Sequence, residues 1–232
     1  MEWAGLGEVE IQALRLSLAI AARSVLVSLP FAIFIAWLLT RRRFPGRMLL
    51  DATVHLPLVL PPVMVGYLLL LLFGARGPIG QWLARSFDVH LVFTGSGAAL
   101  ATAVMTFPLM VRSIRIALEG VDRGLEDAAR TLGAGALDRF LTVTLPLIAP
   151  GVLAGAVTAF AAGLGEFGAV ITFVGNVPGE TQTLPLALYA ALQTPGGDAL
   201  AARLATISFL LALVALLLAE LLARRVRRGL GR

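Results

Sequence analysis

Residues 119–146 read EGVDRGLEDAARTLGAGALDRFLTVTLP and form the longest polar interval in a chain that is otherwise mostly apolar. We call this interval the knuckle. Asp122 is placed to cap a helix whose first turn carries two acidic side chains, where negative charge suits the helix dipole. Gly133 and Gly135 can end that helix, because glycine accepts the left-handed conformation at low cost. A helical knuckle between apolar blocks predicts a surface that a soluble partner can hold.

The composition places the chain in a membrane. Hydrophobic residues make up 58% and charged residues 14%, and the mean hydropathy is +0.89. Soluble domains carry about a quarter charged residues, so this chain is too apolar for that class. Several apolar blocks reach the ~20 residues that a helix needs to cross a bilayer core. There is no cysteine, which excludes disulfides, zinc fingers and iron–sulfur sites.

We predict an all-α, polytopic membrane helix bundle with five transmembrane helices, formed by one domain of residues 1–232. The second span contains Pro57, Pro61 and Pro62, which interrupt its backbone hydrogen bonds. Such a segment is tolerated only where protein or water satisfies the freed carbonyls, so it should face a partner or a cavity. The expected spans are 13–40, 48–73, 95–118, 147–174 and 200–223, and short helices are expected at 81–86 and 184–192.

The basic residues set the expected orientation. All 19 are arginines, and fourteen follow the first span, flank or occupy the knuckle, or lie in the C-terminal tail. The opposite side has only Arg76 and Arg85. By the positive-inside rule, the knuckle and the C-terminus are cytoplasmic and the N-terminus is outside. The isoelectric point near 11.1 therefore reflects topology, and we expect no nucleic-acid partner.

The chain carries no motif for chemistry of its own. A G-x-x-x-x-G-K-[ST] phosphate loop, G-x-S-x-G and H-E-x-x-H are all absent from the sequence. A proton-driven secondary carrier would need more carboxylates at mid-depth, and an intramembrane enzyme would need a nucleophile beside a base. We therefore favour a transport subunit driven by another protein, with no cofactor bound by this chain, and keep those two classes as alternatives.

The knuckle contains a recognisable motif. Asp127-Ala128-Ala129, then Gly133, then Val143-Thr144-Leu145-Pro146 resembles the "EAA" loop of ABC-importer permeases, whose pattern is E-A-A-x-x-x-G, nine residues, then I-x-L-P. The spacing matches, and Asp127 and Val143 stand where the family has Glu and Ile. The resemblance implies a coupling helix that sits in a cleft on a cytoplasmic ATPase subunit. The implied coupling residues are Glu126, Asp127, Ala128, Ala129, Gly133, Leu145 and Pro146.

A second set of motifs is similar to the molybdate-permease branch of that family. These are Pro57-Leu58-Val59-Leu60-Pro61-Pro62, Gly165-Glu166-Phe167-Gly168, Pro178-Gly179-Glu180-Thr181 and Thr194-Pro195-Gly196-Gly197. Sulfate permeases share the Gly-Glu-Phe-Gly element, so the last two motifs are what favour molybdate, and a sulfate or tungstate permease is kept as the alternative. The resemblance implies a homodimer in the cell inner membrane, two ATPase subunits that bind ATP, and an extracytoplasmic molybdate-binding protein.

The translocation path needs N–H and O–H donors that hold a tetrahedral dianion without trapping it. Glu166 would repel the anion, so we expect it either to pair with Arg23 or another donor at an outer gate, or to cap a helix. Arg112 and Arg115 either attract an anion at the cytoplasmic end of the third span or are positive-inside anchors, and His55 is expected to be packed or hydrogen-bonded and not a ligand. The expected path or gate residues are Pro57, Pro61, Pro62, Gly165, Glu166, Phe167, Gly168 and Asn176.

Overall fold

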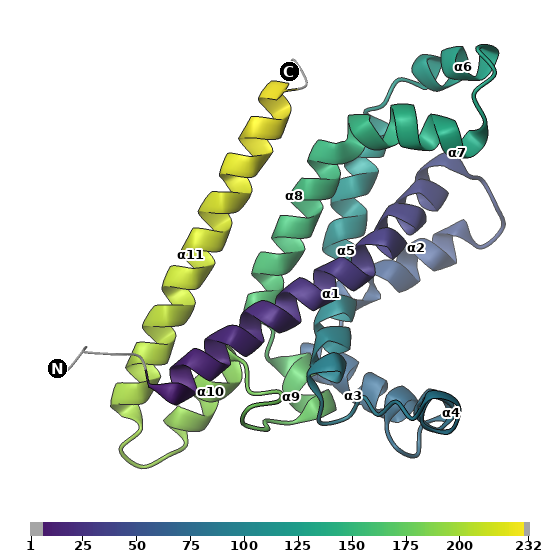
Figure 1. Cartoon of the computed structure of the whole chain (residues 1–232). Coiled ribbons are helices and arrows are strands. Elements are labelled where there is room, and N and C mark those ends of the chain that lie inside the picture. The colour runs from purple at the N-terminus through teal and green to yellow at the C-terminus, as the bar shows by residue number, and fades with distance from the viewer. Residues whose placement is uncertain (1–6, 230–232) are drawn as a thin grey trace.

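The computed structural model describes residues 7–229, except for the side chains of 219, 220 and 222–229. This part of the chain consists of helices and the loops that join them, without a strand (Figure 1). The predicted all-α class is confirmed. In chain order the elements are α1 (Glu8–Arg41), α2 (Arg47–His55), η1 (Leu56–Leu58), α3 (Pro62–Phe73), α4 (Pro78–Phe87), α5 (Gly95–Glu119), α6 (Arg123–Thr131), α7 (Ala136–Arg139), the π-helix η2 (Phe140–Thr144), α8 (Leu145–Leu164), α9 (Gly168–Val174), α10 (Leu184–Leu192) and α11 (Asp198–Gly229).

Four stretches of helix are long and apolar enough to cross a membrane, and the bent α2–α3 pair makes a fifth if it counts as one span. α1 and α5 correspond to the first and third predicted spans, and α11 corresponds to the fifth. α11 continues through the basic tail to Gly229. The short helix predicted at 184–192 is α10, and the one predicted at 81–86 is the longer α4.

Two predicted spans are not continuous helices. In the second, α2 and α3 are inclined by 115° across the proline-rich break, so the chain turns sharply where a single span was expected. In the fourth, α8 ends at Leu164 and α9 begins only at Gly168. The prediction of one helix over 147–174 is wrong, because three residues at the Gly-Glu-Phe-Gly motif leave the helical path. The long apolar helix there instead runs from Ala136 to Leu164.

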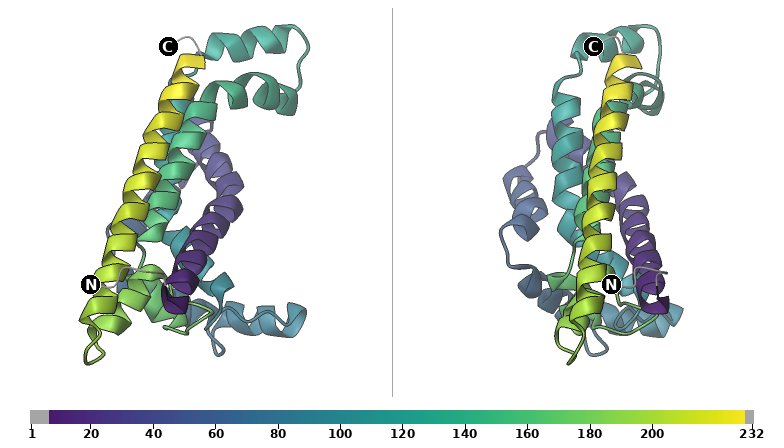
Figure 2. Two further views of the ribbon diagram at one scale, coloured as in Figure 1. Left: turned by 60° about the vertical axis from the view of Figure 1, so that its left-hand side comes forward. Right: turned by 90° about the vertical axis from the view of Figure 1, so that its left-hand side faces the viewer.

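Helices α1, α5 and α8 form the centre of the bundle (Figures 1 and 2). Small residues let α5 and α8 approach closely, as in other membrane bundles. A Cβ atom on Gly151 would lie 2.3 Å from the Cβ of Ala117. Ser113 Oγ donates a hydrogen bond to the Gly151 carbonyl oxygen at 3.0 Å. The glycines and alanines of α8 thus provide the close packing that the sequence predicts.

The buried side chains fall into two main layers. One lies at the end of the bundle where α3, α9 and α10 gather, and it surrounds the fully buried Phe173. The other lies toward the knuckle and contains Met110, Ile114 and Ile148. The knuckle itself projects beyond this second layer (Figure 1). The bundle therefore offers one end to the broken spans and the opposite end to the knuckle.

Candidate coupling surface and gate

Local signals build the knuckle. Asp122 Oδ1 accepts a hydrogen bond from the Gly124 N–H at 2.8 Å and caps α6, as predicted. Gly133 follows α6 with a φ of +91°, and a Cβ added there would meet no atom within 4 Å, so backbone conformation alone favours glycine. Gly135 differs from the prediction, because its φ of −65° is ordinary and it precedes α7 instead of ending α6.

One face of the knuckle is exposed and partly apolar. Leu132 is 89% exposed and Leu137 is 71% exposed, and Asp127 and Ala128 of α6 are also exposed. Large exposed apolar side chains next to charges are typical of a protein interaction site. The left view of Figure 2 shows this segment standing clear of the helix bundle. Asp127, the acidic position of the motif, is therefore exposed to solvent.

Glu126 faces the other way. Its Oε1 lies 3.0 Å from Arg41 Nη2 at the end of α1, and it accepts a hydrogen bond from Thr144 Oγ1 at 2.9 Å. The Arg41 side chain is 10% exposed and that of Glu126 is 24% exposed. Glu126 thus fastens α6 to α1 and to the start of α8, while its neighbour Asp127 is free to meet a partner. Arg41 and Thr144 have no local sequence signal for this role.

The end of the motif joins the bundle. Leu145 is half-buried and packs against the core layer near the knuckle, whereas Pro146 is exposed at the second position of α8. Ala129 is half-buried on α6. Of the predicted coupling residues, Asp127, Ala128 and Gly133 therefore lie on the exposed side, and Glu126 and Leu145 connect the knuckle to the spans.

The two broken spans meet at the far end of the bundle, where α3 and α9 lie against each other. A Cβ on Gly168 would lie 2.7 Å from the Cβ of Pro62, and one on Gly66 would lie 2.6 Å from the Ala169 carbonyl oxygen. Pro57 lies in η1, and Pro61 precedes α3. The predicted gate residues Pro62 and Gly168, which are about a hundred positions apart, are therefore brought together. Such broken helices inside a bundle are typical of membrane transport paths.

Glu166 caps α9. Its Oε1 accepts a hydrogen bond from the Ala169 N–H at 2.9 Å, which satisfies a backbone donor at the start of that helix. The predicted ion pair with Arg23 is not formed among the described residues, where Arg23 is exposed on α1. The reason is geometric, because a carboxylate three residues before a free N–H reaches it without help from another helix.

The two other predicted path residues, Phe167 and Asn176, lie in different parts of the fold. Phe167 lies at the break, with its ring centroid 5.1 Å from that of Tyr189. Asn176 lies beyond α9, and its Nδ2 donates to the Leu186 carbonyl oxygen at 3.4 Å. Asn176 therefore connects the loop to α10 instead of joining the contact between Pro62 and Gly168.

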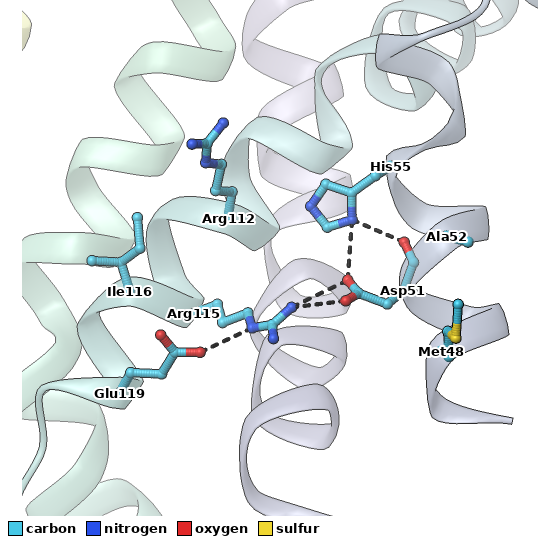
Figure 3. Close-up of a pocket in the computed structure, with 8 residues that line it drawn as sticks. All are labelled: Met48, Asp51, Ala52, His55, Arg112, Arg115, Ile116 and Glu119. Atoms are coloured by element: carbon cyan, nitrogen blue, oxygen red, sulfur yellow. Dashed lines mark hydrogen bonds and ion pairs between the residues drawn. The ribbon is translucent and has the colours of Figure 1, made fainter. Parts of the chain in front are cut away.

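A charged hollow lies between α2 and the end of α5 (Figure 3). Arg115 Nη1 lies 3.2 and 3.0 Å from the two Asp51 carboxylate oxygens, and Arg115 Nε lies 3.0 Å from Glu119 Oε1. His55 Nδ1 is 3.2 Å from Asp51 Oδ1. Arg112 lines the same hollow. Arg115 is thus held by two carboxylates, and His55 is hydrogen-bonded to Asp51, which agrees with the expectation of a packed or hydrogen-bonded histidine.

Comparison with known proteins identifies the family. A family model described as the inner membrane component of binding-protein-dependent transport systems matches residues 28–228. The chain belongs to this family. The permease is 59% identical over 227 residues to the molybdenum transport system permease protein ModB of Escherichia coli (strain K12), covering 98% of this chain and 99% of that protein. The corresponding protein of Haemophilus influenzae is 54% identical over 223 residues, covering 96% of this chain and 97% of that protein.

More distant relatives agree with the fold. The sulfate transport system permease protein CysT of Escherichia coli (strain K12) is 38% identical over 219 residues, covering 91% of this chain and 79% of that protein. A bacterial alginate ABC transporter matches with a TM-score of 0.76 at 20% identity, covering 95% of this chain and 80% of that chain. An amino acid ABC transporter matches with a TM-score of 0.64 at 18% identity, covering 94% of each chain. The permease is a transport subunit and not an enzyme.

Proposed function

We propose that this chain is the transmembrane permease subunit of an ATP-binding-cassette importer that carries molybdate into the cytoplasm. The observation that carries the proposal is the 59% identity to a molybdenum transport permease over nearly the full length of both chains. The exposed knuckle supports it, because it offers Asp127 and nearby leucines to a soluble partner. A separate ATPase subunit supplies the energy, since this chain lacks a phosphate-binding loop.

The choice of anion follows the degree of identity. Molybdenum permeases are 59% and 54% identical, whereas the sulfate permease is 38% identical. Molybdate, tungstate and sulfate are all tetrahedral dianions, so a path for one has much of the chemistry needed for the others. Sulfate or tungstate transport is the rival function, and competition between the anions separates the three.

Membership of a binding-protein-dependent family implies a soluble binding protein and ATPase partners. We further infer a homodimer of this permease with two ATPase subunits in the cell inner membrane. The N-terminus would lie outside and the knuckle and C-terminus in the cytoplasm, which the distribution of arginines supports. The binding protein would then deliver the anion at the end where α3, α9 and α10 gather.

The geometry suggests how force is transmitted. ATP-driven closure of the ATPase subunits would move the knuckle, which is continuous with α8 through η2 and joined to α1 through Glu126 and Arg41. The α8 helix leads directly to the break at residues 165–167. Movement of the knuckle can thereby reach the contact between the two broken spans and convert an inward-open path to an outward-open one.

The test is reconstitution of the permease with its ATPase and binding protein in liposomes. We expect uptake of labelled molybdate only when ATP is supplied on the knuckle side, with weak competition by excess sulfate. Uptake that persists with an inactivated ATPase and follows a proton gradient would instead support a secondary carrier. Uptake of sulfate in preference to molybdate would overturn the proposed cargo.

A further inference from the structure

The charged hollow between α2 and α5 is an open depression of about 640 Å³ on the knuckle side of the break in the second span. His55, at one side of the hollow, is the last residue of α2 and directly precedes η1 with its Pro57. The hollow therefore lies between the broken second span and the knuckle. Its lining is Met48, Asp51, Ala52, His55, Arg112, Arg115, Ile116 and Glu119 (Figure 3).

Arg115 keeps donors free for a ligand. A guanidinium group has five N–H donors. Nε is directed at Glu119, and Nη1 at the Asp51 carboxylate. Nη2 makes no hydrogen bond within residues 7–229. The two carboxylates hold the guanidinium plane, so that the remaining N–H groups are fixed in position.

His55 is oriented by the same carboxylate. Its Nδ1 lies 2.9 Å from the Asp51 carbonyl oxygen and 3.2 Å from Asp51 Oδ1. Both neighbours are acceptors, so Nδ1 carries a hydrogen, and Figure 3 shows the other ring nitrogen turned away from Asp51. A carboxylate that holds one ring nitrogen fixes the orientation of the other. With the hydrogen on Nδ1, Nε2 of the neutral ring has no hydrogen to donate, so the donors to an anion come from the two arginines.

Arg112 completes the set. It is exposed on α5, lines the same hollow, and has no hydrogen bond or ion pair within the described part of the chain. We propose that Arg112 and Arg115, with His55 at the edge, form an oxyanion-binding site between the predicted gate and the knuckle, where the transported dianion binds before release. This proposal rests on the proposed function, because the site would bind the same anion that the permease transports.

The balance of charges in the hollow suits a site that binds the anion only transiently. The charges of Arg112 and Arg115 are matched by those of Asp51 and Glu119, so the hollow has little excess positive charge. A path must bind its ion well enough to admit it and weakly enough to let it leave. Direct N–H donors with nearly balanced charge meet both needs, and the carboxylates keep the arginines from holding the dianion too tightly.

The test is protection of a single cysteine in the permease–ATPase complex. The chain contains no cysteine, so Ala52→Cys places a single thiol in the lining, and no native cysteine has to be replaced first. In nanodiscs, sodium molybdate should slow thiol labelling at this position, whereas sodium chloride of equal ionic strength should not. Arg112→Ala should weaken the apparent molybdate affinity about 10- to 100-fold, the loss expected for one charge-assisted hydrogen bond. Arg76→Ala, which removes an exposed arginine on the other side of the bundle, should change nothing.

Three outcomes would overturn the site. These are labelling that molybdate does not slow, protection that survives Arg112→Ala with unchanged affinity, and protection that is lost equally in Arg76→Ala. Lipid phosphate has the same oxyanion chemistry, so nanodiscs with and without phosphatidylglycerol are compared. Protection that requires the anionic lipid and not molybdate assigns the hollow to a lipid. Molybdate uptake is measured on the same complex, so active transport without protection refutes only this site, and absent transport refutes the proposed function.

Discussion

Removing the Glu126 carboxylate should loosen the knuckle while leaving its outer surface intact. In Glu126→Ala, Arg41 and Thr144 both lose their partner, and these side chains are 10% and 3% exposed in their native positions. A hydrogen bond to a charged group contributes about 1.5–3 kcal/mol, and an exposed ion pair about 0.2–1 kcal/mol. Because this pair is largely covered, we expect a local loss of about 2–3 kcal/mol, near the upper of those ranges.

That loss makes detachment of the knuckle roughly 30- to 150-fold more frequent, since 1.4 kcal/mol is tenfold. Hydrogen exchange across 123–144, measured by mass spectrometry in the permease–ATPase complex, should rise accordingly. Molybdate uptake should fall more than ATP hydrolysis, because a loose knuckle transmits less movement. The exchange rate of Glu126→Gln should lie between those of the native protein and Glu126→Ala. Its amide oxygen still accepts a hydrogen bond from Thr144, but it carries no charge to pair with Arg41.

Asp127→Ala is the matched control. It removes the same charge from the adjacent residue, but Asp127 is exposed and has no hydrogen bond or ion pair in the described structure. Exchange across 123–144 should stay unchanged, while coupling to the ATPase is lost. The reasoning is refuted if Glu126→Ala leaves exchange across this segment at the native rate, or if both variants show the same pattern.

Three further predictions concern backbone geometry. Gly133→Ala should lower stability by about 1–2 kcal/mol in a thermal scan and uncouple ATP hydrolysis from transport, because φ is +91°, whereas Gly135→Ala with φ of −65° should be tolerated. Gly66→Ala should impair transport and lower the melting temperature, because its Cβ would lie 2.6 Å from a backbone oxygen of α9. Gly165→Ala should change neither, because its Cβ would lie 3.7 Å from the nearest atom, the Ala162 carbonyl oxygen. Glu166→Gln should keep the cap and most transport activity, whereas Glu166→Ala should lose both; equal uptake by these two variants would contradict a capping role.

Features set by neighbouring residues could be predicted from the sequence. Asp122 and Gly133 determine the ends of α6 through local rules, and the helical class follows from composition and span length. Three closely spaced prolines predict an interrupted second span, but they do not specify its 115° bend. The break at residues 165–167 has no comparable signal, because the sequence around it stays mostly apolar and the nearest prolines, Pro150 and Pro178, lie more than ten residues away.

Contacts between distant residues could not be predicted. Arg41 and Glu126 are 85 positions apart, and Asp51 and Arg115 are 64 apart. Whether two such charges meet depends on helix packing and rotation, which a single sequence does not fix. The same holds for Glu166, whose charge suggested a partner on another helix, although a backbone N–H three residues ahead satisfies it.

The central claim is that a partner ATPase works this permease from the cytoplasmic side through the knuckle. Leu132→Cys tests it directly, because this residue is 89% exposed on the knuckle and the chain has no other cysteine. A membrane-impermeant thiol reagent should label it from the cytoplasmic side only, and bound ATPase should block the labelling. Labelling from the outer side, or labelling that the ATPase does not affect, would contradict the claim.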